Sequence, residues 1–482
     1  MSDDQSVDQT RKRPLHFQLG SISLLWSLWI LVSVAGSAVF ATMMFGKAEK
    51  SVFMPGPLSP GHHQLADSCE SCHVEQFGGT EVLQSSCIDC HGHEREDGFD
   101  SHPISKFEDP RNAARLEKIN ATQCVTCHVE HRPELTLADG LTQPKDICLH
   151  CHVDIAEDRP SHEGMAFDTC ASSGCHNYHD NRALYTKFLT RHADDADLLE
   201  NPFLDSKDFA DLVYEIMEYP HDRYPVESLD VTSIDAPQNL EVSAQIEREW
   251  LESSHAATGV NCSGCHQPLD EQGQLSDWRD KPGVEGCDGC HTIETELFGN
   301  GKHGMRLAAG LSPMTPGSAL APMNSDVSHE EMNCSSCHGS HQFDVVTAAV
   351  DACETCHADD HTVAYRQSKH YALWLEETEG SGEAGSGVSC ASCHMPREDM
   401  EINDWMERVV VNHNQNASLS PNSKMLRPVC LSCHGLEYSL NALADESIIL
   451  NNFSSAPGDL VDSVDMALRL QEEHERKKAA RQ

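Results

Sequence analysis

The chain has 482 residues, a length sufficient for two or three domains, but only 39% of them are hydrophobic and 6% are aromatic. The side chains that usually build an apolar interior are therefore scarce, whereas cysteine (22) and histidine (30) are abundant. The net charge of −43 repels polyanions, so it excludes a nucleic-acid-binding protein and favours partners with basic surfaces. A halophilic or marine habitat would explain the same acidity.

An uncharged run lies close to the N-terminus. The basic residues 11–13 precede it, and its apolar part, residues 22–45, has about the 20 residues that a helix needs to span a bilayer. The basic triplet predicts that the N-terminus stays in the cytoplasm. A cleaved signal peptide is the alternative, since residues 36–38 would suit a peptidase, although the apolar run is longer than that of most signal peptides. We predict a single-pass anchor in the inner membrane, with the rest of the chain in the periplasm.

The cysteines fall into eleven pairs, and a histidine follows each pair directly. Ten pairs have the spacing Cys-x-x-Cys-His, and one has four residues between its cysteines. The paired residues are Cys69 and Cys72, Cys87 and Cys90, Cys124 and Cys127, Cys148 and Cys151, Cys170 and Cys175, Cys262 and Cys265, Cys287 and Cys290, Cys334 and Cys337, Cys353 and Cys356, Cys390 and Cys393, and Cys430 and Cys433. The histidines that follow them are His73, His91, His128, His152, His176, His266, His291, His338, His357, His394 and His434.

This spacing is typical of covalent attachment of haem c. Two thiols add to the vinyl groups on one edge of the porphyrin, and the adjacent histidine becomes the proximal ligand of the iron. Structural zinc and disulfides are the alternatives, but neither requires a histidine after every cysteine pair. The sequence therefore predicts eleven covalently attached haem c groups.

The haem groups would also explain the scarcity of apolar residues. The motifs span 366 residues, which leaves about 33 residues for each haem. We predict a mainly α fold with much irregular structure, a haem-filled core and an N-terminal transmembrane helix.

Other histidines are candidates for the distal face of each iron. Some follow a motif so closely that they cannot easily reach the far side of their own haem, and we predict that they bind a neighbouring haem. A surface histidine or a partner of a haem propionate is the alternative at each position. His255 and His370 stand out because each lies in a predicted helix near a tryptophan. The candidates are His62, His93, His102, His131, His162, His179, His255, His303, His341, His361, His370 and His413.

The motifs divide the chain into two groups, separated by an acidic stretch without any motif. We predict a cytoplasmic tail and anchor at 1–46, a five-haem domain at 47–190, an acidic helical or linker region at 191–250, a six-haem domain at 251–440 and a C-terminal helical tail at 441–482. Within the second group, "GVNCSGCHQP" at 259–268 and "GVSCASCHMP" at 387–396 are nearly the same. The similarity indicates one haem-binding unit used twice, or convergence on a common attachment motif.

The motifs resemble those of the multihaem c-type cytochromes, over residues 69–434. The anchor followed by "CESCH", "CIDCH", "CVTCH" and "CLHCH" is similar in plan to the quinol-oxidising cytochromes of the NapC/NrfH type, and the short spacings resemble cytochrome c3-like proteins. The second half, with "SSHAATGVNCSGCH", "GKHGMRLAAGL" and "GVSCASCHMP", resembles the octahaem family that includes hydroxylamine oxidoreductase. No motif ends in the lysine used at the catalytic haem of related reductases, and no tyrosine can be assigned to the cross-link of hydroxylamine oxidoreductase.

These features favour an electron carrier over an enzyme. We expect it to transfer electrons between the membrane, with quinol as one candidate donor, and other redox proteins or acceptors in the periplasm or outside the cell. The alternative is a multihaem oxidoreductase acting on a small nitrogen or sulfur compound at one five-coordinate haem. No residue can be assigned a catalytic role from the sequence.

Overall fold

The computed structural model describes residues 19–45, 54–75, 79–97, 102–117, 119–137, 140–144, 146–159, 162–163, 178–179, 186–202, 204, 227–269, 273–403, 406–419, 421–458 and 460–481. The chain forms two compact units, Met1–Pro55 and Gly56–Gln482. The predicted haem site at Cys170, Cys175 and His176 lies outside the described residues, as does the side chain of His93.

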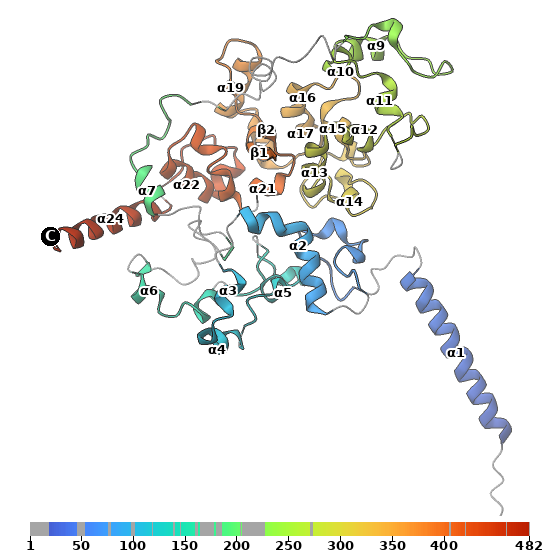
Figure 1. The fold of residues 1–482 in the computed structure, drawn as a ribbon, viewed down its shortest axis with the longest axis horizontal. Coiled ribbons are helices and arrows are strands. Elements are labelled where there is room, and N and C mark those ends of the chain that lie inside the picture. The colour runs from blue at the N-terminus through green and yellow to red at the C-terminus, as the bar shows by residue number, and fades with distance from the viewer. Residues whose placement is uncertain are drawn as a thin grey trace, which may run out of the picture. The chain divides into compact units, whose positions relative to one another are not determined.

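The first unit contains one long helix, α1, over Leu19–Phe45 (Figure 1). None of its 27 residues is charged, and Ser23–Met43 is long and apolar enough to cross a bilayer. A signal sequence near an N-terminus has the same properties. A helix at residues 22–45 was predicted from the sequence, and its retention as an anchor stays a prediction.

The second unit consists mostly of short helices joined by irregular segments, which confirms the prediction of a mainly helical fold (Figure 1). The helices of the first group of motifs are α2 (Thr80–Asp97), α3 (Ile104–Phe107), α4 (Ala113–Leu116), α5 (Cys124–Cys127) and α6 (Ile155–Asp158). Those of the second group are α9 (Ala244–Leu251), α10 (Ser254–Ala257), α11 (Cys262–His266), α12 (Glu285–Asp288), α13 (Thr292–Asn300), α14 (Met305–Ala308), α15 (Cys334–His338), α16 (Val345–Ala349), α17 (Asp351–Cys356), α18 (Asp360–Tyr365), α19 (Lys369–Thr378), α20 (Cys390–His394) and α21 (Gln415–Leu419). Because helices this short are not stable alone, they depend on what packs against them.

A two-stranded antiparallel hairpin, which the sequence analysis did not predict, follows the motif of α20. Its strands are β1 (Arg397–Asn403) and β2 (Met406–Val411), paired in register from Arg397 opposite Val411. Val410 in β2 is fully buried. The hairpin returns the chain to the end of its motif, where Asn412 N–H donates to the carbonyl of Pro396 at 2.9 Å, and His413 follows two residues after β2.

A conventional apolar core lies near the C-terminus. It joins the short helix α7 (Thr186–Arg191) to α22 (Leu436–Ala444) and α24 (Ser463–Ala479), and α23 (Glu446–Leu450) lies between the last two. Figure 1 shows α7 beside α24. The buried members of this cluster are Leu189, Leu426, Leu436, Leu440, Val464 and Ala467. Cys430 packs against the cluster, so the last motif is attached to this core.

Candidate functional site

Each described Cys-x-x-Cys-His motif forms one helical turn. In six motifs, whose histidine lies just beyond a short helix or 3-10 turn, the histidine N–H donates to the carbonyl of the first cysteine, with distances from 2.8 Å at His73 to 3.0 Å at His152. The motifs of α11, α15 and α20 run as helix from the first cysteine to the histidine. Positions i, i+3 and i+4 share one face of a helix, so each turn presents two thiols and one imidazole on the same side. This is the arrangement that haem c attachment requires.

Polar residues placed just before the first cysteine start three of these turns. Asn261 Oδ1 accepts from Cys262 N at 2.8 Å, and Asn333 Oδ1 accepts from Ser335 N at 2.8 Å. Ser389 Oγ accepts from Ser392 N at 3.1 Å. Side-chain capping of this kind stabilises the first turn of a helix by about 1 kcal/mol.

Nine proximal histidines each face a second histidine ring at nearly constant spacing. The ring centroids of the nine pairs are 5.9–6.3 Å apart. The pairs are His91 with His62, His152 with His102, His128 with His179, His291 with His255, His266 with His341, His357 with His303, His338 with His413, His394 with His361, and His434 with His370. Two imidazoles bound to one metal through bonds of about 2 Å place their ring centres roughly 6 Å apart. The residues therefore fit a haem iron between each pair.

All nine second rings belong to the twelve distal candidates, and none pairs with the motif closest to it in sequence. His341 follows His338 by three residues but faces His266, and His361 follows His357 but faces His394. The two groups of motifs differ in completeness. All six proximal histidines of the second group have a partner ring, whereas a partner ring is seen for three of the four described proximal histidines of the first group.

Several of these rings are oriented by a hydrogen bond at Nδ1. His102, for example, donates Nδ1–H to the carbonyl of Tyr178 at 2.7 Å, and His266 donates to that of Arg279 at 2.6 Å. Similar bonds run from His128 to Gly140 O, from His361 to Ile449 O, from His413 to Val411 O and from His434 to Asp197 O. A bond of this type fixes the tautomer and leaves Nε2 available to a metal.

Burial favours the neutral form of several of these imidazoles. Burial, followed by the repulsion of the facing ring, lowers the pKa of His303 and of His370 to about 4, and burial also lowers the pKa of His394 to about 4. Neutral imidazole is the form that binds a metal. These surroundings therefore keep the rings ready for ligation.

The motifs of the second group follow one another in space in the same order as in the sequence. Thiols of successive motifs lie close enough to contact or to influence each other's pKa, and the pairs are Cys265 with Cys287, Cys287 with Cys334, Cys337 with Cys353, Cys353 with Cys390, and Cys393 with Cys430. In the first group, Cys72 lies near Cys90 and Cys87 contacts Cys124. The second group is therefore one continuous row of six motifs.

The two alternative roles of the cysteines find no support in the described residues. The described cysteines form no disulfide with one another. In the same part of the chain, no group of three His, Cys, Asp or Glu side chains converges as at a directly coordinated metal ion. The twenty described cysteines instead remain as one pair per motif, the arrangement that thioether attachment needs.

The twin stretches of the second group are alike in structure as well as in sequence. Ser253 and Ser368 are buried N-cap residues of α10 and α19, and each lies two residues before a paired histidine, His255 or His370. Each of these histidines faces the proximal histidine of the motif that comes directly after the twin motif. His255 faces His291, and His370 faces His434. The repeated sequence thus corresponds to a repeated local structure.

In each copy of this repeated unit, an aromatic side chain donates a hydrogen bond to the backbone just before the motif. Trp250 Nε1 donates to the carbonyl of Val260 at 3.2 Å, and the hydroxyl of Tyr365 donates to the carbonyl of Val388 at 2.7 Å. In both copies the valine lies two residues before the first cysteine. These bonds fix the backbone just before the motif begins.

One carboxylate contacts a paired ring. Glu130 Oε1 lies 2.7 Å from His62 Nδ1, and Ser59 donates to Glu130 through its backbone N–H and its hydroxyl, both at 2.8 Å. Burial alone would raise the pKa of Glu130, but the hydrogen bonds from His62 and Ser59 lower it to about 2. The sequence analysis missed Glu130, because a partner 68 residues away from His62 leaves no local signal.

Contacts between residues 61–67 and 302–318 join the two groups of motifs. Lys302 Nζ donates to the carbonyl of Gly61, and Arg306 donates to the carbonyl of Gln64 at 2.6 Å. Because the paired ring of His62 and that of His303 lie in these two segments, the contact brings one site of the first group next to one of the second.

Arg306 should hold this contact, which gives a testable prediction. In Arg306→Gln, loss of charged hydrogen bonds to Gln64 and Ser312 should cost about 1–3 kcal/mol locally. Hydrogen exchange at residues 61–67 should then accelerate on the order of 10- to 100-fold. Arg111→Gln, which removes an exposed guanidinium bound to Asp109, is the matched control and should leave that exchange unchanged. Equal exchange in both variants would contradict the role of Arg306.

Five predicted ligands stand outside the nine pairs, and they are the distal candidates His93, His131 and His162 and the proximal His73 and His176. Among the described residues, no ring contact is found for His73, and His176 itself lies outside the described part. His131 donates Nδ1–H to the carbonyl of Gly56 at 2.8 Å, which leaves its Nε2 available, and burial lowers the pKa of His162. Nothing is described for the side chain of His93.

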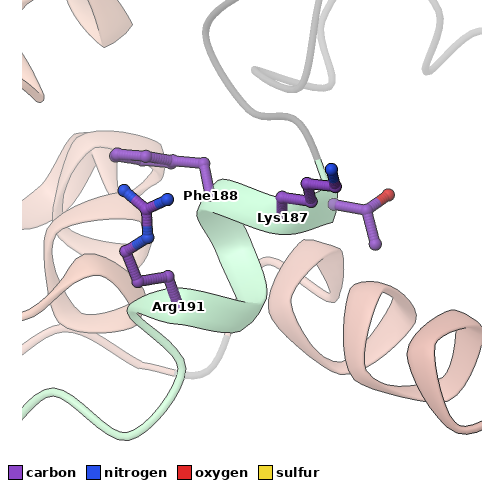
Figure 2. A pocket seen from close by; sticks show the side chains of 4 residues that line it. Lys187, Phe188 and Arg191 are labelled. Carbon is purple, nitrogen blue, oxygen red and sulfur yellow. The ribbon is translucent and has the colours of Figure 1, made fainter.

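A shallow pocket on α7 is separate from all of these sites. Thr186, Lys187, Phe188 and Arg191 line it, with Phe188 and Arg191 on one side of the helix and Lys187 on the other (Figure 2). The guanidinium of Arg427 lies 4.3 Å from the ring centroid of Phe188. None of the lining residues is a paired histidine or a motif cysteine, so the pocket adds nothing to the candidate haem sites.

Two regions of the chain, residues 61–153 and 254–358, match the family model of cytochrome c3. Each matched region contains four of the Cys-x-x-Cys-His motifs. These matches support a multihaem c-type cytochrome. The family implies covalently bound haem c, iron binding and electron transport. No curated protein and no solved structure matches the chain.

Proposed function

We propose that this cytochrome binds eleven haem c groups and carries electrons between the inner membrane and acceptors in the periplasm or outside the cell. The observation that carries the proposal is the set of nine imidazole pairs with one common spacing. When bound, haem supplies a one-electron couple at its iron. The row of motifs in the second group supports conduction along the chain rather than isolated sites.

Each iron of the nine paired sites would be held by two imidazoles. Both axial positions are then filled by the chain itself, so no small substrate can bind the metal without displacing a histidine. His131 and His162 are the first candidates for the two remaining sites, those of His73 and His176. His93 is the third.

The ligand pairs also connect distant parts of the chain. His370 in α19 faces His434, and His303, just before α14, faces His357. Each pair would therefore close a loop of tens of residues around one metal, which restricts the motion of both segments. Rigid sites suit electron transfer, because little rearrangement then accompanies a change in charge.

The helix α1 would retain the cytochrome in the inner membrane as a single-pass anchor, with the haem sites in the periplasm. Quinol in the membrane is the proposed donor or acceptor at that end. At the other end, the charge of −43 would steer partners with basic surfaces to the cytochrome.

Purified full-length protein tests this proposal. We expect intact mass and the pyridine haemochrome spectrum to give eleven haem c groups per chain, and EPR of the oxidised protein to show only low-spin ferric signals. We also expect quinol to reduce the protein in membrane vesicles. Fewer bound haems, or thiols that react with alkylating reagents, would contradict the proposal.

A second candidate function rests on His73, which has no ring partner among the described residues. If no histidine binds opposite His73, that site would be five-coordinate and open to a small nitrogen or sulfur compound. The same EPR experiment separates the two functions, because an open site gives a high-spin ferric signal. Turnover of hydroxylamine, nitrite, sulfite or tetrathionate by the purified protein would then favour the enzyme.

A further inference from the structure

Glu130 gives the site of His91 a carboxylate hydrogen-bond partner. Its Oε1 lies 2.7 Å from Nδ1 of His62, whose ring centroid lies 5.9 Å from that of His91. The distance is that of a charge-assisted hydrogen bond. His62 therefore donates to a carboxylate through one nitrogen and is free to bind a metal through the other.

The carboxylate is held in place independently of His62. Ser59 donates to Oε2 through its backbone N–H and to Oε1 through its hydroxyl, both at 2.8 Å. About a third of each side chain, Glu130 and His62, is exposed, so water screens the interaction only in part. Ser59 thus holds the carboxylate of Glu130 in one position, where it accepts a hydrogen bond from Nδ1 of His62.

Six other paired rings have weaker partners at Nδ1. The described hydrogen bonds from His102, His128, His266, His361, His413 and His434 all end on neutral backbone carbonyls. Two proximal rings have a carboxylate nearby, but Glu294 lies 4.0 Å from His291 Nδ1 and Asp359 lies 3.9 Å from His357 Nδ1. Both distances exceed that of a hydrogen bond.

We propose that Glu130 is a positioning residue that acts through His62 to lower the reduction potential of the haem held by His91. A carboxylate acceptor makes the imidazole a more basic ligand, and its negative charge stabilises the more positive, oxidised iron. This inference rests on the proposed function, because it assumes haem at that site.

The position of this site makes the effect relevant to the whole chain. Two residues close to His62 in the sequence accept hydrogen bonds from the second group. The carbonyl of Gly61 accepts from Lys302, and that of Gln64 accepts from Arg306. His303, which faces His357, directly follows Lys302 in the sequence. A lowered potential at His91 therefore places a difference in potential at the point where the two groups of motifs meet.

The test is Glu130→Gln in the full-length holoprotein. The amide keeps an oxygen acceptor for His62 but removes the charge, so one haem should titrate at a higher potential in spectroelectrochemistry. The low-spin EPR signal of one site should change at the same time. Glu134→Gln makes the same chemical change four residues later at an exposed position and should alter neither readout.

A double-mutant comparison assigns the effect to His62. In a His62→Met background, Glu130→Gln should cause a smaller shift, because the through-space effect of the charge remains but the hydrogen bond that makes the ligand more basic is gone. Unchanged potentials in Glu130→Gln, with all haems bound, would overturn the inference. If the wild-type protein bound no haem at all, the proposed function itself would fail, so the two failures are distinguishable by haem count.

Discussion

Protein produced without haem attachment should not fold from Gly56 onward. We expect the apoprotein to show little helical signal in far-UV circular dichroism, no cooperative thermal transition and rapid digestion by proteases. The holoprotein should be helical and resistant. The loss should be nearly complete, because covalent haem would provide most of the interior.

The described structure gives the physical reason. Only eighteen hydrophobic residues are buried in the described part of the chain, and six of them form the cluster between α7, α22 and α24. A domain of about 300 residues usually buries about three quarters of the surface that its unfolded chain exposes. Helices of four to ten residues cannot compensate, because they are marginal without tertiary packing.

The comparison requires two preparations of the same chain. One is made in cells that carry out c-type haem attachment, and the other in cells that do not. Segments 186–191 and 426–467 carry the conventional core and should be the last to be digested in the apoprotein. A folded apoprotein with a sharp thermal transition would show that side chains alone build the interior, and it would remove the main support for a haem-filled core.

The sequence predicts what depends on local spacing. Each cysteine pair with its histidine is a single helical turn, so the thiols and the proximal imidazole can be read from four or five consecutive residues. The apolar helix at Leu19–Phe45 and the mainly helical fold follow from composition and length in the same way. The hairpin after α20 was missed, although Arg408-Val-Val-Val ends its second strand and valine favours strands.

The pairing of the rings depends on features that are not local. His62 faces His91, and His102 faces His152, across intervals that contain no hint of the pairing. The sequence could name the twelve candidates because histidine is a strong iron ligand, but it could not assign them. Assignment requires the path of the chain around the metal sites. Glu130 was missed for the same reason, since it meets His62 only in the folded chain.

Removing one second-ring histidine should open exactly one site, and His303 is the best position for this test. Its ring is partly buried, 6.2 Å from that of His357, and burial lowers its pKa to about 4. In His303→Ala, about one of eleven low-spin ferric centres should become high-spin. The site should also bind carbon monoxide in the reduced protein, which the wild-type sites should not do.

The surroundings of His303 favour a local effect. A Cβ on Gly304 would lie 2.2 Å from the carbonyl oxygen of Phe298, and one on Gly301 would lie 2.9 Å from that of His413, so the backbone on both sides is tightly packed. The alanine variant should therefore leave a cavity of imidazole size rather than a collapsed site. Added imidazole should enter this cavity and restore the low-spin signal, a result that a misfolded variant could not give.

His329→Ala is the matched control, because His329 is exposed and contacts only Glu330 across 3.6 Å among the described residues. It should keep the wild-type EPR spectrum and should not bind carbon monoxide. If His303→Ala also stayed fully low-spin, with eleven haems bound, His303 would not be a ligand. The ring spacing near 6 Å would then lose its meaning as a sign of shared iron, and the other eight pairs would need the same test.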